Sequence, residues 1–225
     1  MLIDIITLFP EMFGGVFGES IIKRAVEKKI LEIRLTQLRD FAFDKHRQVD
    51  DSPFGGGSGM VLKPEPMYRA FREVLQSADE NFSRRVIITD PSGEVFTQKK
   101  AKELAKFDRL IFICGHYEGF DARIYDLADE LISIGDYVLT GGELPAMVIV
   151  DAVARMLPNV LGSAESAETD SFFNGILSFP QYTRPRDFEG KLVPEILLSG
   201  NHAEIKKWRE EQALKITKLR RPDLI

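Results

Sequence analysis

The sequence contains few residues that could crosslink the chain or hold a metal ion. It has a single cysteine, Cys114, which excludes an intrachain disulfide and any zinc site built from several thiolates. Its three histidines, His46, His116 and His202, lie far apart and share no metal-ligand spacing. We therefore predict no metal site made by the protein alone, and a lone thiol fits a reducing cytoplasm.

Long apolar segments are also missing. No stretch approaches the roughly 18 uninterrupted apolar residues of a membrane-spanning helix, so we expect no contact with a membrane. The N-terminal stretch MLIDIITLFPEMFGG is apolar, but no basic segment precedes it and Asp4 interrupts it. It predicts a first strand and not a signal peptide.

The usual glycine motifs of nucleotide-binding sites are absent. G-x-G-x-x-G occurs at no strand-to-helix turn, which argues against a dinucleotide site, and G-x-x-x-x-G-K-[ST] does not occur. Basic residues are scarce from Leu110 to Gly175, where Arg123 and Arg155 stand against eleven acidic residues. A polyphosphate would be repelled by this segment unless several magnesium ions intervened.

Basic residues are instead in excess on two flanks. The segments Lys23–Asp50 and His202–Ile225 each carry three more basic than acidic residues, although the whole chain has a net charge of −5. Solvated helix faces are the simpler explanation, but the flanks leave room for a nucleic-acid partner.

What the sequence does contain is an alternation of short apolar runs and helical patterns, which indicates an α/β fold. The runs RVIITD and RLIFICG are nearly continuous in apolar residues, as in a parallel sheet covered on both faces. Strands are predicted at Ile3–Leu8, Glu32–Thr36, Arg85–Thr89, Arg109–Cys114 and Leu131–Ile134, with a short one near Val138. Helices are predicted at Ser20–Lys28, Pro66–Gln76, Gln98–Lys106, Ala122–Ala128 and Glu143–Leu157.

The pattern changes near residue 160, which suggests two domains. We predict an α/β domain over 1–160 and a flexible linker over 161–175, because the latter is rich in serine, glycine, alanine and acid. Residues 176–225 are expected to form a small, mostly helical domain that contains the basic stretch HAEIKKWREEQALKITKLRR. The predicted helix Glu143–Leu157 is apolar almost all round, so it is buried in the fold or against a second subunit.

Three loops that contain glycine follow the later strands. In an open parallel sheet ligands bind outside the carboxyl ends of the strands, so these loops together predict a cleft. The third loop carries Asp136 and Glu143 and no basic residue, which favours a ligand with a neutral heterocycle and a cation. S-adenosyl-L-methionine has both, and Glu118 is the carboxylate that we place near it. The loops are Thr89–Glu94, Cys114–Asp121 and Gly135–Glu143.

Six motifs spread over nearly the whole chain carry a family resemblance. They are SPFGGGSGMVLKPEP, GHYEGFDAR, SIGDYVLTGGELPAM, DSFF, YTRP and LLSGNHAEIKKWR, in this order. Together they resemble bacterial tRNA (guanine-N1)-methyltransferases, which methylate the guanosine at tRNA position 37, 3′ of the anticodon. The resemblance implies the SPOUT fold, in which a trefoil knot in the main domain builds the cofactor pocket. It also implies a homodimer with active sites at the subunit interface, and a requirement for Mg²⁺.

The resemblance assigns roles to individual residues. It implies that Asp170 is the general base and that Arg155 acts on the target base. Asp50 and the glycine run that ends at Gly59 match a region tied to tRNA handling and catalysis. In the basic C-terminal helix we expect tRNA contacts from Lys206, Lys207 and Arg209. The residues implied to bind the cofactor are Thr89, Pro91, Gly115, Tyr117, Glu118, Ile134, Leu139, Gly141 and Gly142.

The residue types suit this chemistry. N1 of guanine carries a proton at neutral pH, and a carboxylate within hydrogen-bond reach can remove it, an effect worth roughly 10²–10⁴ in rate. The negative charge that then spreads onto O6 would be stabilised by a guanidinium. Asp170 and Arg155 lie on opposite sides of Pro158, so a mobile linker would bring the base over bound guanosine.

Two other functions remain open from the residues. One is a non-catalytic RNA-binding module that has the same fold, and the other is an ATP-dependent enzyme that uses the loops for phosphate. Cys114 could be a nucleophile, but it ends the apolar run LIFI, and such cysteines are usually inert core residues.

Overall fold

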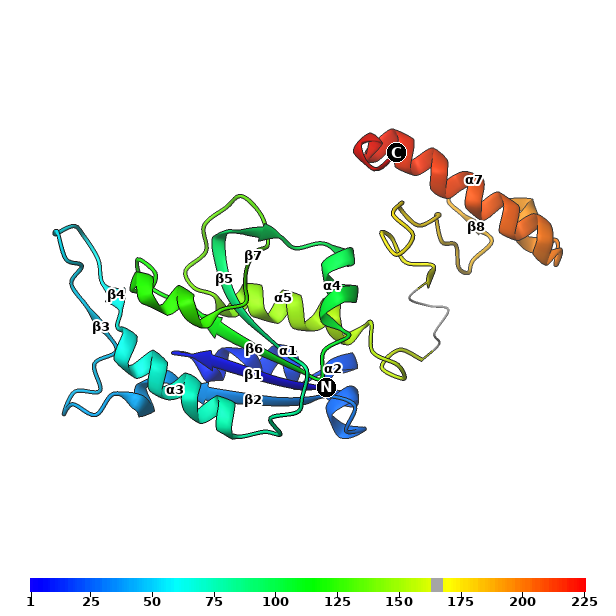
Figure 1. Cartoon of the computed structure of the whole chain (residues 1–225). Helices are drawn as coiled ribbons and strands as arrows, with labels where there is room; N and C mark the ends of the chain where they lie inside the picture. Colours follow the sequence, from blue (N-terminus) through cyan, green and yellow to red (C-terminus); the bar gives the residue numbers. More distant parts are fainter. Residues whose placement is uncertain (163–167) are drawn as a thin grey trace. The chain divides into compact units, whose positions relative to one another are not determined.

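The computed structural model describes residues 1–162 and 168–225, and a five-stranded parallel sheet forms the centre of its N-terminal unit (Figure 1). The spatial order of its strands is β2-β1-β6-β5-β7, and all four pairings are parallel. The predicted α/β class with a parallel sheet is thereby confirmed. The strands are β1 (Leu2–Thr7), β2 (Glu32–Gln37), β5 (Arg84–Val95), β6 (Arg109–Cys114) and β7 (Glu130–Ser133).

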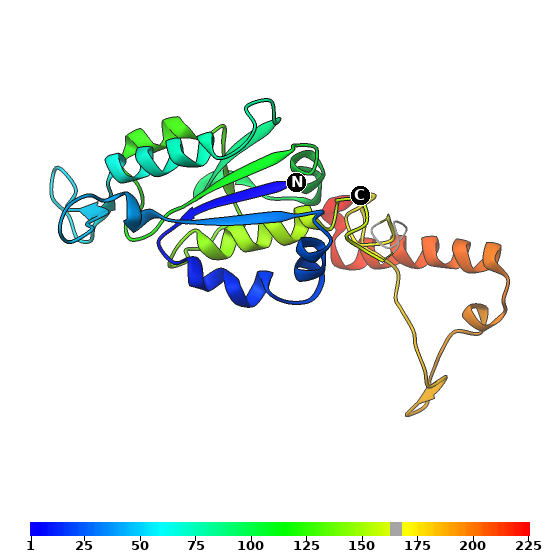
Figure 2. The same cartoon turned by 90° about the horizontal axis from the view of Figure 1, so that it is seen from below.

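Helices cover both faces of the sheet, as strands that are apolar on both sides require (Figure 2). The first face carries 3₁₀ helix η1 (Pro10–Phe13), α1 (Gly14–Phe17), α2 (Ser20–Glu27), α4 (Gln98–Leu104) and α5 (Glu143–Ala154). The second face carries α3 (Pro64–Gln76) and the 3₁₀ helices η2 (Leu38–Phe41) and η3 (Ala122–Leu127). In β1, Ile5 packs in the core under α5, whereas its neighbour Ile6 packs in the core under α3.

Strand β5 differs from its predicted extent. Thr89 and Glu94 both pair with Ile132 of β7, so the residues between them bulge out of the sheet. The loop expected after Thr89 is therefore a bulge within one longer strand.

The prediction of a short strand near Val138 is wrong. Gly135 has a φ of 144° and turns the chain out of β7. Val138 then lies in an irregular stretch, with its side chain 86% exposed. A glycine conformation that other residues rarely adopt thus ends the sheet here.

A buried arginine joins the second face to the sheet. The Nε of Arg109 donates to Oδ2 of Asp4 at 2.7 Å, and both side chains are 2% exposed. Its Nη1 and Nη2 donate to the carbonyls of Leu75 and Val74 in the last turn of α3. A cation at this position also interacts favourably with the negative end of the helix dipole.

The chain divides into two compact units, Met1–Gly162 and Ser163–Ile225. The second contains the hairpin β8 (Asp187–Phe188) and β9 (Lys191–Leu192), η4 (Glu195–Leu198), α7 (His202–Arg220) and η5 (Pro222–Leu224). Helix α7 begins at His202 with Asn201 as its N-cap, whose side chain accepts from the Glu204 N–H at 3.3 Å. The linker predicted over 161–175 lies partly outside the described residues, and the predicted domain boundaries stay a prediction.

No helix in the described ranges, 1–162 and 168–225, is long and apolar enough to cross a bilayer.

We predict that Arg109→Met lowers the free energy of unfolding by about 3–5 kcal/mol, because it leaves the Asp4 carboxylate buried without its cation. The double variant Asp4→Asn/Arg109→Met should recover part of this loss. Arg47→Met, which breaks a pair with Asp40 whose side chains are 66% and 59% exposed, should cost under about 1 kcal/mol. Urea denaturation measures all three, and equal losses for Arg109→Met and Arg47→Met would contradict the role of the buried pair.

Candidate functional site

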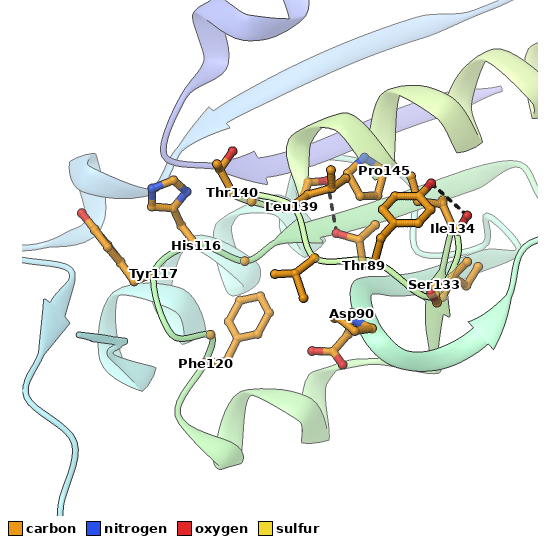
Figure 3. Close-up of a pocket in the computed structure, with 18 of the residues that line it drawn as sticks. Thr89, Asp90, His116, Tyr117, Phe120, Ser133, Ile134, Leu139, Thr140 and Pro145 are labelled. Atoms are coloured by element: carbon orange, nitrogen blue, oxygen red, sulfur yellow. Dashed lines mark hydrogen bonds between the residues drawn. The ribbon is translucent and has the colours of Figure 1, made fainter. Parts of the chain in front are cut away.

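One cavity lies at the carboxyl edge of the sheet, where β5, β6 and β7 end or bulge (Figure 3). Its volume is about 290 Å³. All nine residues expected to bind a cofactor line it: Thr89, Pro91, Gly115, Tyr117, Glu118, Ile134, Leu139, Gly141 and Gly142. The structure therefore brings together residues from three loops that are far apart in the sequence.

Hydrogen bonds tie these three loops together at Gly142. Its N–H donates to the carbonyl of Gly115 at 2.9 Å, and its carbonyl accepts from the hydroxyl of Thr89 at 3.2 Å. A Cβ at this position would overlap Oγ1 of Thr89 and would lie 2.8 Å from the Gly115 nitrogen. Only glycine allows this close approach, and it places the start of α5 against the ends of β5 and β6.

The acidic side chains that line the cavity are not Asp136 and Glu143, the two expected from the third loop. Asp136 is exposed and does not line the cavity. Glu143 points into the protein interior, is 2% exposed, and accepts from the Thr7 hydroxyl at 2.7 Å. Glu143 therefore anchors α5 to β1, and the acidic lining comes from Glu118 and from Asp90.

Asp90 was not singled out from the sequence, although it follows Thr89 directly. The bulge in β5 turns it into the cavity, where it accepts from the Tyr125 hydroxyl at 2.8 Å and from the Ser92 N–H at 2.8 Å. Burial alone would raise the pKa of Asp90, but the bonds from Ser92 and Tyr125 lower it overall. Burial and the bond to Asp90 raise the pKa of Tyr125 to about 12, so Tyr125 stays a donor at neutral pH.

The glycine-rich hairpin packs beside the cavity. Strands β3 (Asp50–Asp51) and β4 (Val61–Leu62) form it, and the Glu118 N–H donates to the Met60 carbonyl at 3.0 Å. Gly59 has a φ of 83°, and a Cβ there would overlap the Glu118 side chain. The hairpin that carries Asp50 and Gly59 is therefore held against a loop of the cavity.

His116 lines the cavity from the same loop. Its ring lies 4.8 Å from that of Phe9 and 4.7 Å from that of Tyr117, centroid to centroid. Its Nδ1 is buried and has no hydrogen-bond partner among the described residues. This nitrogen is therefore a buried polar atom without a hydrogen-bond partner in the part of the chain that the structure describes.

Cys114 ends β6 directly behind the glycine loop. It is 1% exposed, and burial together with the charge of Glu143 raises the pKa of its thiol well above the usual value. A buried, neutral thiol is a poor nucleophile. The structure thus places Cys114 in the core, as expected.

The remaining predicted site residues belong to other elements of the two units. Arg155 follows the last residue of α5 in the first unit, and Asp170 belongs to the second unit. Lys206, Lys207 and Arg209 lie on α7. In the described part of the chain, no group of three or more histidine, cysteine, aspartate or glutamate side chains could hold a metal ion.

Comparisons with known proteins match the chain along its whole length. A family model described as tRNA (Guanine-1)-methyltransferase TrmD matches residues 1–225. The tRNA (guanine-N(1)-)-methyltransferase of Dictyoglomus turgidum is 58% identical over 223 residues, which are 99% of this chain and 89% of that protein. The proteins of the same name from Geobacillus kaustophilus and Staphylococcus haemolyticus are 58% and 56% identical over 226 residues, covering 100% of this chain and 91% of each relative.

We predict that Gly142→Ala lowers the free energy of unfolding by about 1–3 kcal/mol, since the added methyl group must displace Thr89 or Gly115. Gly15→Ala is the matched control, because a Cβ there meets nothing within 4 Å. That control should be neutral or slightly stabilising in helix α1. Guanidinium denaturation of both variants checks this, and equal stabilities would show that the loops are not closely packed at Gly142.

Proposed function

The chain belongs to the tRNA (guanine-N1)-methyltransferase family, and from this we propose that it transfers a methyl group from S-adenosyl-L-methionine to N1 of guanosine 37 in tRNA. The observation that carries the proposal is the full-length match to curated enzymes that are more than half identical. A protein that acts on tRNA is proposed to work in the cytoplasm.

The cavity has the chemistry that S-adenosyl-L-methionine needs. Gly141 brings backbone without a side chain to the cavity, where it can meet the adenine, and Ile134 and Leu139 offer apolar contacts. Among the described residues that line the cavity there is no lysine or arginine, whereas Asp90 and Glu118 are acidic. A site of this charge suits a sulfonium and disfavours ATP. When bound, S-adenosyl-L-methionine supplies an electrophilic methyl group.

In this proposal, Asp170 and Arg155 both act on the target guanine. The Asp170 carboxylate accepts the N1 proton of guanine, so that the N1 electron pair is free to form the new bond to carbon. The Arg155 guanidinium stabilises the negative charge that develops on O6. Holding the guanine base in line with the methyl group provides the proximity that the displacement requires. The family also implies a requirement for Mg²⁺, and the proposal gives this ion no role in the methyl transfer.

The proposal includes a knotted main domain and a homodimer with active sites at the subunit interface. Supporting the dimer, Leu144 and Val148 lie on one side of α5 and are 46% and 48% exposed in the single chain. Helix η1, which packs against α5, also exposes Met12 by 43%. Exposed apolar side chains on neighbouring elements are found at interaction surfaces. The knot follows from the family alone.

Residues in both units are proposed to contact tRNA. Asp50 and Gly59 belong to the hairpin that packs on Glu118, and so they would hold RNA next to the bound cofactor. Lys206, Lys207 and Arg209 are exposed on α7 and would contact the RNA, the two lysines through its phosphate backbone.

The direct test uses unmodified tRNA transcripts with G or A at position 37. We predict that the purified protein incorporates labelled methyl groups into the G transcript and not into the A transcript. Binding of both transcripts without methyl transfer would instead identify a non-catalytic RNA-binding module. Calorimetric binding of ATP, with none of S-adenosyl-L-methionine, would support an ATP-dependent enzyme.

Asp170→Asn is predicted to lower single-turnover methylation by at least ~10², because the amide cannot accept the N1 proton. Its affinity for S-adenosyl-L-methionine should stay near that of the unchanged protein, which separates loss of the base from loss of the cofactor. Asp187→Asn, an exposed acid in β8, is the control. A near-normal rate for Asp170→Asn would remove Asp170 as the base.

Arg155→Ala is predicted to raise the barrier of the methyl-transfer step by about 2.7–4 kcal/mol, if its guanidinium stabilises charge on O6. Arg155→Lys should recover part of the rate, because it restores the charge without the planar fork. Single-turnover kinetics measure both variants, and an unchanged rate for Arg155→Ala contradicts the assignment.

A further inference from the structure

A second cavity lies entirely within the C-terminal unit. Its volume is about 390 Å³, within the range of roughly 300–1,000 Å³ that is usual for small-ligand sites. From Phe179 the chain runs out to the hairpin β8–β9 and returns through η4 to α7 (Figure 2). Lining residues come from the segments on either side of the hairpin, from η4 and from α7: Phe179, Pro180, Gln181, Tyr182, Thr183, Arg184, Arg186, Val193, Leu197, Leu198, Ile205 and Arg209.

The polar lining of this cavity is basic. Arg184, Arg186 and Arg209 contribute three guanidinium groups, and the described lining residues include no carboxylate. Within residues 1–162 and 168–225, none of these three arginines forms an ion pair with an acidic side chain. Three arginines that share one cavity without a carboxylate favour an anionic ligand, and a guanidinium fork matches a phosphate in particular.

Aromatic rings accompany these arginines. The guanidinium carbon of Arg209 lies 4.8 Å from the centroid of the Phe179 ring, so the side chain is stacked and its plane is oriented. Tyr182 is 48% exposed, and its ring centroid lies 6.4 Å from that of Trp208. Exposed aromatic faces and arginine planes are the groups on which unpaired RNA bases stack.

We propose that this cavity binds one unpaired nucleotide of the RNA substrate other than the target guanosine. Arg184 and Arg186 bind its phosphate, and the stacked Arg209 and the open face of Tyr182 hold its base. The apolar floor of Val193, Leu197 and Ile205 excludes water beneath the base. This inference rests on the proposed function, because it assumes that the substrate is an RNA.

The geometry also separates Arg209 from the other basic residues of α7. Lys206, Lys207 and Lys215 do not line the cavity, whereas Arg209 does. A purely electrostatic contact would depend on charge and not on which residue carries it. The cavity therefore predicts that Arg209 and Arg186 matter more than a lysine of equal charge on the same helix.

The test uses the single tryptophan of the full-length chain, Trp208, as a fluorescence reporter. The probes are a single-stranded RNA pentanucleotide and a ribose-phosphate pentamer of the same charge without bases. We expect the RNA to quench Trp208 emission and the abasic pentamer to bind at least about tenfold more weakly, given the contribution of stacking. Equal affinity for the two probes, or no binding of the RNA, would overturn the proposal.

Substitutions of the lining arginines then test which side chains contact the RNA. Arg186→Ala and Arg209→Ala should each weaken RNA binding by about tenfold or more, and Arg209→Lys should recover only part of it. Lys215→Ala, an exposed charge-matched control on α7, should change the affinity by less than about twofold. Equal effects of Arg209→Ala and Lys215→Ala would show that the helix binds RNA only through its charge.

Methylation assays distinguish failure of this site from failure of the enzyme. In Arg186→Ala the KM for tRNA should rise while the affinity for S-adenosyl-L-methionine stays unchanged. If the unchanged protein binds no S-adenosyl-L-methionine and transfers no methyl group, the proposed function fails. If it does both and Arg186→Ala leaves the KM for tRNA unaltered, only the nucleotide site fails.

Discussion

The hydrogen bonds that meet at Gly142 are the constraint on which the rest of the site depends. They join Gly115, which follows β6, and Thr89, at the bulge in β5, to the residue that precedes α5. A side chain at this glycine would separate the three loops. The buried bond from Thr7 to Glu143 secures the same helix end to β1. Because these contacts lie in the core, the cavity is expected to be formed before any ligand arrives.

The cavities of the two units differ in the charge of the residues that line them. The cavity at the sheet edge is lined by acids and glycines, which suits a small cationic cofactor. The cavity in the C-terminal unit is lined by arginines and aromatic residues, which suits a polyanion with bases. The net charge of −5 conceals this separation, because it averages a strongly acidic middle segment with two basic flanks.

The sequence predicted the sheet well because β1 and β6 are buried along their whole length and are apolar almost throughout. It also identified nine of the residues that line the first cavity, although those assignments came from the family motifs. It missed Asp90, because the bulge in β5 depends on pairing with β7, which no local pattern reports. It counted Glu143 among the acids of the third ligand loop, since an acid beside glycines gives no sign of a partner as distant as Thr7. The C-terminal cavity was not foreseen for the same reason.

The central claim is that S-adenosyl-L-methionine lies between the loops that contain Pro91, Tyr117 and Gly141. A crystal structure of the protein with S-adenosylhomocysteine tests it most directly. We expect electron density for the ligand in the cavity lined by these residues, with its adenine beside the backbone of the Gly141–Gly142 loop. Density for the ligand at any other place, with this cavity empty, would contradict the account.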